Sequence, residues 1–365
     1  MTTESTAARP LRRVPLLVLG FACLVFGVGA GLARLGVAVP AAMASVAALH
    51  GPLMIGAFLG TVIALERAVA TGRRWAYAGP LLAGAGGIAA IAGGADAGAW
   101  LLVAGSTVLV VASGAIFVRQ RALFTFTLVA GALCWLVGSA LWATGAAVHE
   151  VVGWWLAFLI LTIAGERLEL SRFMPPSANA RRMFGAVLLV IGAGLFGSAA
   201  PWGAQVFAGG LVALALWLAR YDIARRTVRT AGLTRYIAVC LLSGYVWLAI
   251  GGGVVVAAGG FAPGSRTYDV AVHALGLGFV FSMVFGHAPV IFPAVLRVTM
   301  PYHAAFYVPL ALLHLSLAVR IAGDATYRLD WVRVGAWGNA LAIAVFIATA
   351  ASAVWRGTRS RGRPA

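Results

Sequence analysis

Two histidines, His273 and His287, lie fourteen positions apart within one of the most apolar stretches of the chain. Fourteen residues are close to four helical turns, so both side chains leave nearly the same face, about 21 Å apart along the axis. Polar side chains at membrane depth are costly and usually mark a pathway or a binding site. The pair therefore predicts two separate sites for haem or a metal ion, each needing a partner from another helix.

Three more histidines, His50, His303 and His314, fall within apolar stretches. His303 and His314 are eleven positions apart, almost three helical turns, so they share a face. We expect His50 or His314 to face His273, and His303 to face His287, with ligation at both levels. The alternative is that these histidines only form hydrogen bonds between helices.

Met54 and Asp269 each lie one helical turn from a histidine. Met54 is at i+4 from His50, and its thioether suits copper or an axial haem position. The common alternative for such a methionine is packing. Asp269 is at i−4 from His273, where its carboxylate can accept a hydrogen bond from the imidazole and orient the ring.

Two of the histidines begin a His-x-Pro sequence, with prolines at Pro52 and Pro289. A proline inside a helix removes one backbone donor and displaces the carbonyl four residues earlier, so we expect a bend at each. Such a bend gives room for a macrocycle or an ion beside the imidazole, or is an ordinary kink of a membrane helix.

Two Glu-Arg pairs, Glu66-Arg67 and Glu166-Arg167, fall where the second and sixth apolar stretches end, and Glu169 follows the latter. Charged pairs at a membrane boundary can serve structure alone. An enzyme that reduces a substrate within the bilayer must also receive protons, so these three glutamates are candidates for a proton entry point. Both interpretations stay open.

The composition predicts a membrane protein. Hydrophobic residues make up 62% of the 365 residues and charged residues 10%, and the mean hydropathy is +0.96; soluble proteins carry roughly a quarter charged residues. The net charge of +17 comes from scattered arginines, which fits membrane topology and not a nucleic-acid groove. The three cysteines form no CxxC, which argues against a disulfide scaffold or a thiolate zinc site. We expect the lipid bilayer as partner and no nucleic acid.

A hydrocarbon core of about 30 Å requires about 20 apolar residues per helix. On this measure we expect an all-α, polytopic bundle of about twelve membrane-spanning helices. The softest boundaries lie in the glycine-rich segment 79–99 and at Pro201. The expected spans are 14–33, 40–66, 75–94, 97–118, 123–145, 151–170, 183–199, 202–219, 236–260, 268–295, 302–322 and 331–354.

The arginine distribution agrees with this count. If the N-terminus is cytoplasmic, 22 of the 27 basic residues fall on the cytoplasmic side, as the positive-inside rule requires. We therefore expect a cytoplasmic tail at 1–13, one transmembrane domain at 14–355 and a basic cytoplasmic tail at 356–365, in a bacterial inner membrane. The five exceptions are Arg34, Arg266, Arg320, Arg328 and Arg333.

Two short motifs resemble the NnrS family, twelve-helix membrane proteins described as binding haem and copper and linked to nitric-oxide metabolism. The segment 50–58 (His-Gly-Pro-Leu-Met-Ile-Gly-Ala-Phe) is similar to that family's early histidine-bearing helix. The segment 273–278 (His-Ala-Leu-Gly-Leu-Gly), followed by Gly286-His287, is similar to its late helix. The resemblance covers these motifs and the helix number, and it implies haem and copper.

The chain is more distantly similar to haem-copper oxidase catalytic subunits. These also have twelve helices, and histidines on the second and tenth hold their low-spin haem. Here the second helix carries His50 and the tenth carries His273 and His287. The consecutive histidines and the His-Pro-Glu-Val-Tyr copper motif of those oxidases are missing, so we do not expect their oxygen-reducing centre.

The sequence thus predicts an NnrS-like membrane protein with haem b, and with copper by resemblance, that serves electron transfer or the handling of a small gas such as nitric oxide. Its electron donor would be a quinol or a cytochrome, and whether it is an enzyme is left open. A permease for a metal ion or small solute and a non-catalytic assembly factor are the rival interpretations. The candidate haem ligands are His50, His273, His287 and His314, and the candidate metal ligands are His287, His303 and Met54.

Overall fold

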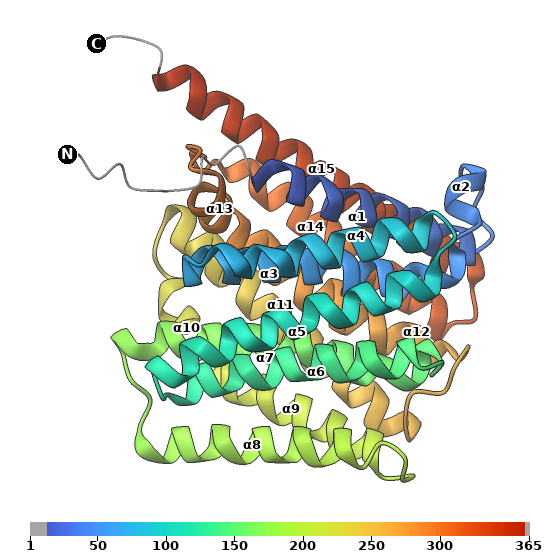
Figure 1. The fold of residues 1–365 in the computed structure, drawn as a ribbon, viewed down its shortest axis with the longest axis horizontal. Helices are drawn as coiled ribbons and strands as arrows, with labels where there is room; N and C mark the ends of the chain where they lie inside the picture. Colours follow the sequence, from blue (N-terminus) through green and yellow to red (C-terminus); the bar gives the residue numbers. More distant parts are fainter. Residues whose placement is uncertain (1–12, 362–365) are drawn as a thin grey trace.

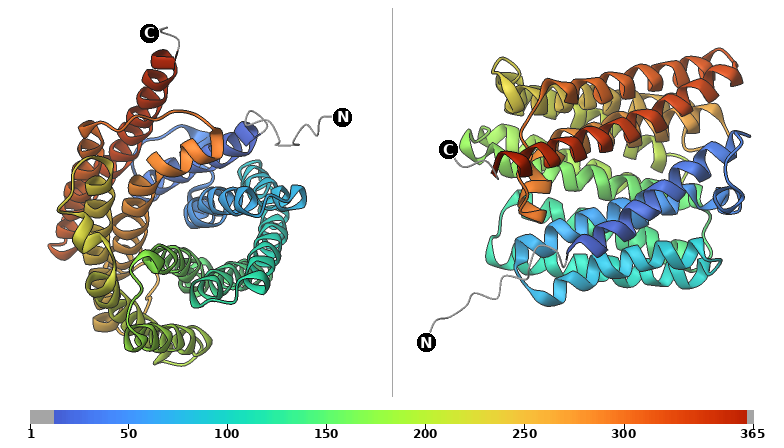
Figure 2. Two further views of the ribbon diagram at one scale, coloured as in Figure 1. Left: turned by 90° about the vertical axis from the view of Figure 1, so that its left-hand side faces the viewer. Right: turned by 90° about the horizontal axis from the view of Figure 1, so that it is seen from above.

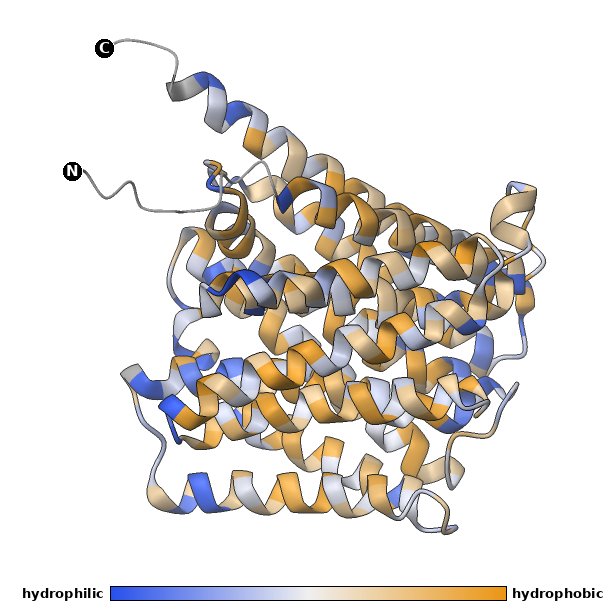
Figure 3. Ribbon diagram, viewed as in Figure 1, coloured by the Kyte–Doolittle hydropathy of each residue, from blue (hydrophilic) through white to orange (hydrophobic). Residues whose placement is uncertain are grey.

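A computed structural model describes residues 13–361, and all regular structure within that range is helical. The long helices run side by side and together form one layer, with their ends at its two sides (Figure 1). Hydrophobic residues cover their middle parts, and hydrophilic residues gather toward the two ends (Figure 3). Eleven of the helices are long and apolar enough to cross a membrane. The prediction of an all-α, polytopic membrane bundle is confirmed.

The first half of the chain supplies the early membrane helices and the short turns between them. Its elements are α1 (Val14–Arg34), α2 (Ala41–Ala44), the 3-10 turn η2 (Ala47–Leu49), the π-helix η3 (Pro52–Leu59), α3 (Gly60–Thr71), the 3-10 turn η4 (Arg74–Tyr77), α4 (Ala78–Ile91), α5 (Ala95–Arg119), α6 (Leu123–Ala143) and α7 (Val148–Leu170).

The second half begins with a hairpin and ends with the longest helix. Its elements are the 3-10 turn η5 (Ser171–Phe173), α8 (Ala178–Phe196), α9 (Gly203–Tyr221), α10 (Ala224–Thr227), α11 (Gly232–Ala258), α12 (Arg266–His273), the π-helix η6 (Ala274–Phe281), α13 (Ser282–Leu296), the 3-10 turn η7 (Ala304–Phe306), α14 (Tyr307–Ala325) and α15 (Leu329–Arg361).

The shorter helix α4 is not among these eleven and is the candidate for a twelfth crossing. With η4 it forms a continuous helical segment over 74–91, which packs along α5. Its two ends lie on opposite sides of the layer (Figure 1). The chain therefore starts α1 and ends α15 on the same side. We call this side arginine-rich and the opposite one arginine-poor, after the sequence distribution.

The second span begins later than predicted. The apolar run was expected to form one helix over 40–66, but continuous helix starts only at His50 and runs to Thr71. A proline ring clashes with the carbonyl four residues earlier, so Pro52 is tolerated in a first turn but not deeper in a straight helix. His50 consequently lies at the arginine-poor end of its helix and not near the midplane.

Helix α7 forms the centre of the bundle. All six side chains of residues 155–160 are fully buried. Seen along the helices, the early helices curve round one side of the molecule and the late helices form the other (Figure 2, left). Because lipid tails are as apolar as leucine, such packing is stabilised by close van der Waals contact, with glycines allowing helices to approach.

The two predicted tails fall largely at the limits of the described range. Of the tail 1–13, only Arg13 is described. The predicted C-terminal tail begins as helix, because α15 continues to Arg361, and residues 362–365 lie outside the described range.

Candidate functional site

A cavity of about 660 Å³ opens among the helices at the arginine-poor side. We call it the histidine cavity, because His50, His149 and His273 line it. Its walls come from α1, from His50 and the π-helix η3 that follows it, from the first half of α7, from the segment α12–η6, and from α14 and α15. Of the residues proposed from the sequence, His50, Met54, Asp269 and His273 line this one space. The site is therefore assembled from both halves of the chain.

His50 is fixed against α1. Its Nδ1 atom lies 2.7 Å from the backbone oxygen of Gly27. A carbonyl oxygen only accepts, so Nδ1 carries the proton and Nε2 keeps its lone pair. Gly31, one turn further, leaves the room for the ring, because a Cβ atom there would lie 2.7 Å from His50 Cε1 and 2.8 Å from Nδ1. The two glycines of α1 thus set the orientation of the imidazole.

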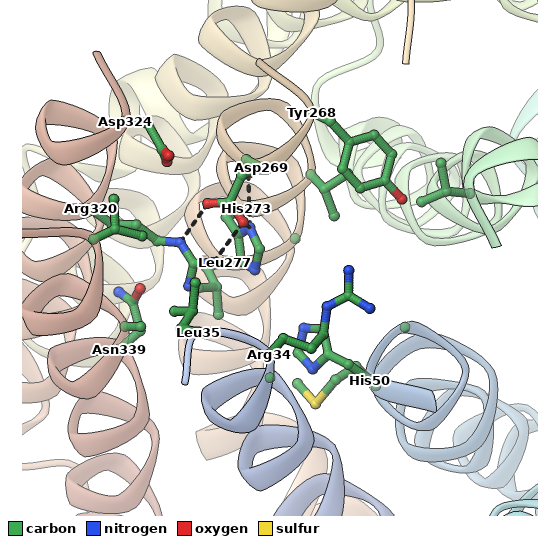
Figure 4. A pocket seen from close by; sticks show the side chains of 18 of the residues that line it. Arg34, Leu35, His50, Tyr268, Asp269, His273, Leu277, Arg320, Asp324 and Asn339 are labelled. Atoms are coloured by element: carbon green, nitrogen blue, oxygen red, sulfur yellow. Dashed lines mark hydrogen bonds and ion pairs between the residues drawn. The ribbon is translucent and has the colours of Figure 1, made fainter. Parts of the chain in front are cut away.

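His273 is fixed by Asp269 one turn earlier. Its Nδ1 donates to the Asp269 backbone oxygen at 2.8 Å, and the Asp269 carboxylate lies 3.3 Å from the same nitrogen. That carboxylate also accepts two bonds from the guanidinium of Arg320 on α14, at 2.7 and 2.8 Å. Arg320 is buried and Asp269 half-buried. Asp269 therefore holds His273 in one tautomer and connects it to α14 (Figure 4).

The two imidazoles lie together. Their ring centroids are 6.1 Å apart and their planes differ by 18°. His50, and not His314, is thus the residue that faces His273. Two turns deeper, Phe58 and Phe281 repeat the arrangement with centroids 6.2 Å apart. The second and tenth membrane helices thus meet through these two ring pairs.

Both histidines stand next to a π-helix. Residues 52–59 follow His50 and residues 274–281 follow His273, each as an eight-residue π-helical segment. A π-helix is rare and is frequent at functional sites, because it shifts side chains relative to the regular helical face. In each helix a phenylalanine lies eight positions after the histidine: Phe281 is the last residue of its segment, and Phe58 is the last but one. The two halves of the site therefore share one local design.

Four of the five arginines that the sequence places on the arginine-poor side line the histidine cavity: Arg34, Arg266, Arg320 and Arg328. Arg320 is paired with Asp269, and Arg328 with Asp330 at 2.9 Å. Arg266 stacks on the Tyr327 ring, 3.7 Å from its centroid. Arg34 forms no hydrogen bond or ion pair with the described residues. The sequence reasoning missed this cluster, although its signal was available as the exceptions to the positive-inside rule.

Asp324 adds a second carboxylate beside the Asp269–Arg320 pair. It lies four residues after Arg320 on α14 and is 7% exposed, and its Oδ2 atom is buried without a partner among the described residues. Asn339 on α15 is also buried and faces the same cavity. Figure 4 shows these side chains around His273. Sequence reasoning did not single out either of them.

His314 and His303 lie away from the cavity. His314 accepts from Trp247 Nε1 at 2.9 Å through Nδ1, so its Nε2 donates to Ser243 Oγ at 3.0 Å. Both nitrogens are therefore used in joining α14 to α11. His303 is exposed in the segment before η7, where its Nδ1 accepts from Ala305 N at 3.1 Å. It precedes the helix that was expected to contain it.

His287 lies in the other half of the tenth helix, on α13. Its Nδ1 donates to Met283 O at 2.7 Å, and its Nε2 is buried with no partner among the described residues. Pro289 and Pro293 lie inside the same helix. Met54 instead lines the histidine cavity against Gly27. No hydrogen bond or ring contact joins His287 to His303 in the described range, which also holds no group of three His, Cys, Asp or Glu side chains placed for a metal ion.

The three glutamates come together at the arginine-rich side. Glu66 on α3 interacts electrostatically with Glu166 and Glu169 on α7, and Arg67 lies close to both Glu66 and Glu166. Glu169 also pairs with Arg172 at 3.3 Å. The second and sixth helices thus bring their Glu-Arg motifs to one place, as either a structural or a proton-entry role requires.

Arg167 does not pair with Glu166, its neighbour in sequence. Its guanidinium forms a buried bidentate ion pair with Asp222, with hydrogen bonds of 2.7 and 2.9 Å. The Asp222 carboxylate also accepts from Tyr245 Oη at 2.9 Å and from Ala224 N at 2.7 Å. All its acceptor positions are therefore engaged, and the cluster ties α7 to the α9–α11 connection.

A family model described as Domain of unknown function (DUF8744) matches residues 13–355. The chain belongs to the DUF8744 family. No curated protein and no solved structure matches it. Every residue of the histidine cavity lies within the matched range, so the cavity belongs to the DUF8744 domain itself.

The geometry of the DUF8744 chain permits ligation at one place above all. His50 and His273 each have Nδ1 bound to a carbonyl, which leaves two Nε2 lone pairs at one cavity. A hydrogen bond on the other ring nitrogen is the usual support for a metal-binding imidazole. The surrounding arginines can in addition bind an anionic group.

Proposed function

We propose that this protein is an integral membrane haem protein in which His50 and His273 hold one haem b. The observation that carries the proposal is the pairing of these two imidazoles, 6.1 Å apart at the wall of a large cavity. Electron transfer or the handling of a small gas such as nitric oxide is the corresponding role, in line with the resemblance to the NnrS family.

The separation of the rings fits a shared metal ion. An imidazole nitrogen binds a metal at about 2.0 Å and lies about 1.1 Å from its ring centre, so two imidazoles on one ion have centroids about 6.2 Å apart. The observed distance is 6.1 Å. It also exceeds the distance of direct ring contact, which is about 4 Å.

The walls of the cavity fit a macrocycle with two carboxylates. Apolar side chains line the interior, among them Leu59, Leu156 and Phe281. Arg34 and Arg266 are exposed cavity residues without a carboxylate partner among the described residues. Guanidinium groups bind carboxylates through paired hydrogen bonds. They would take the propionates, while the apolar interior takes the ring.

The bound haem would supply a reversible one-electron carrier. The protein's part is to hold and tune it: the Gly27 and Asp269 carbonyls orient the two imidazoles, and the Asp269 carboxylate increases the basicity of His273. We place the site on the outer side of a bacterial inner membrane, with both termini cytoplasmic, because it opens on the arginine-poor side. A quinol or a cytochrome would donate the electron.

Haem content tests the proposal. Protein purified from haem-replete cells should show a Soret band and about one haem per chain, and His50→Ala and His273→Ala should each lose it. His303→Ala is the matched control, because His303 is exposed and outside the cavity. A colourless wild-type protein that still folds would refute the proposal.

Copper enters the proposal only through the family resemblance. Its candidate ligands Met54, His287 and His303 lie at three different places in the described structure. Metal analysis of the purified protein tests this part independently of haem.

The arginines favour a second candidate function, a permease for a small anion. The cavity is lined by four arginines and by two π-helical segments, and two of the arginines, Arg34 and Arg266, have no carboxylate partner among the described residues, which suits an anionic solute. The two functions differ in the role of Arg34. A permease predicts that the wild type takes up the anion into proteoliposomes and that Arg34→Gln abolishes this uptake. A haem protein predicts that the wild type contains haem and takes up no anion.

A further inference from the structure

A second cavity, of about 450 Å³, lies at the arginine-rich side, away from the histidine cavity. It is formed by the η5–α8 connection and the α9–α10 turn. Four arginines line it: Arg220, Arg225, Arg226 and Arg229. All four are exposed. The proposed function uses none of them.

The charge of this cavity is not neutralised. Asp222 is the one acidic residue that lines it. The Asp222 carboxylate already accepts hydrogen bonds from Arg167, Tyr245 and the Ala224 amide. None of the four arginines forms an ion pair in the described structure. Arg225 donates to the Arg220 carbonyl at 2.8 Å, and Arg226 contacts Met174 Sδ at 3.5 Å. Four positive charges therefore line this cavity, and no carboxylate of the described structure is paired with them.

The cavity borders a surface that faces lipid. Leu216, one turn before Arg220 on α9, is 64% exposed, and Met183 on α8 is 52% exposed. Tyr221, which lines the cavity, has its hydroxyl 4.0 Å from Met183 Sδ. Figure 3 shows α8 passing from a hydrophilic end into an apolar middle part. An amphipathic ligand can therefore place its charge among the arginines and its chains along Leu216 and Met183.

We propose that this second cavity binds the phosphate group of an anionic phospholipid. Basic pockets between helices at the cytoplasmic membrane surface suit such headgroups. The positive-inside rule requires arginines on this side, but it does not require four of them around one cavity. The bound lipid would fasten the α8–α9 hairpin to the rest of the bundle.

The test measures lipid bound to the detergent-solubilised full chain by native mass spectrometry. Dioleoylphosphatidylglycerol is titrated against dioleoylphosphatidylcholine, which has the same acyl chains and no net charge. We expect the wild type to prefer the anionic lipid, and Arg225→Gln/Arg226→Gln to weaken its binding by about fivefold for each arginine removed. The control Arg73→Gln/Arg74→Gln removes two exposed arginines from the same side outside the cavity and should change binding by less than about twofold.

Three results would overturn the proposal. The first is no preference for the anionic lipid over phosphatidylcholine. The second is equal weakening by the two double variants, which would mean that overall surface charge and not the cavity binds the lipid. The third is full displacement of the lipid by millimolar inorganic phosphate, which would assign the cavity to a soluble phosphate compound.

Discussion

His50 and His273, one from the second membrane helix and one from the tenth, lie with ring centroids 6.1 Å apart and planes within 18° of each other. Each donates its Nδ1 proton to a backbone carbonyl, of Gly27 and of Asp269. The two rings are thus held by separate helices and present their remaining lone pairs to one cavity. The proposed haem site depends on this relationship.

Enlarging Gly31 should disturb His50 without removing its nitrogen. A Cβ atom at this position would lie 2.7 Å from the imidazole, and such overpacking costs about 1–3 kcal/mol unless the ring moves. We expect Gly31→Ala to lower the haem content of the purified protein and to broaden or shift its Soret band. Gly114→Ala, where nothing lies within 4 Å of an added Cβ, should leave both unchanged. Equal spectra for the two variants would show that the close contact has no bearing on ligation.

Removing the Asp269 carboxylate should raise the midpoint potential of the haem. Asp269→Asn keeps the backbone oxygen that accepts from His273 but takes away a negative charge 3.3 Å from Nδ1. A less basic imidazole stabilises the reduced iron, so a shift of tens of millivolts upward is expected. Redox titration followed by absorbance measures it. Asp330→Asn, which removes an exposed carboxylate paired with Arg328, should leave the potential in place, and a fall in potential with Asp269→Asn would contradict the assignment.

Breaking the Arg167–Asp222 pair should destabilise the bundle while leaving the haem ligands intact. Their side chains are 4% and 1% exposed, and removing one partner of a buried pair costs about 3–5 kcal/mol. Asp222→Asn should therefore melt well below wild type in detergent. Glu169→Gln breaks the more exposed Arg172 pair, whose side chains are 35% and 51% exposed, and removes a like charge near Glu66. It should therefore melt no lower than wild type. If Asp222→Asn is as stable as the control, the buried pair does not tie α7 to the α9–α11 connection.

Cysteine labelling should show that α4 crosses the membrane. Arg73 and Ala92 are exposed and flank the helical segment 74–91. With the three native cysteines buried, Arg73→Cys should react with an impermeant maleimide only after the membrane is opened, and Ala92→Cys in intact cells. The two mutants would label alike if only eleven helices crossed. The reverse pattern would invert the proposed orientation.

The sequence predicted the helices well because a bilayer demands long apolar runs whatever their partners. The tenth span was expected over 268–295 and is helical over Arg266–Leu296. The predicted start of the second span was wrong. Average hydropathy over the run does not register that the ring of Pro52 limits how far the helix extends toward its N-terminus.

The site was predictable only in part. One-dimensional spacing showed that His273 and His287 belong to different levels, but not which helix meets them: His50 faces His273, whereas His314 uses both nitrogens to join Trp247 and Ser243. Such pairings are tertiary and depend on the rotation of each helix. The cavity arginines, Asp324 and Asp222 were missed for the same reason, because one charged residue in an apolar run does not reveal its partner.

The identity of the axial ligands tests the central claim most directly. Wild-type protein should give the electron paramagnetic resonance and magnetic circular dichroism spectra of a low-spin haem with two imidazole ligands. His50→Met and His273→Met should each give the spectrum of histidine–methionine ligation and a higher midpoint potential, while His314→Met should keep the wild-type spectrum. A wild-type haem spectrum that survives both the His50 and the His273 substitution would contradict the account.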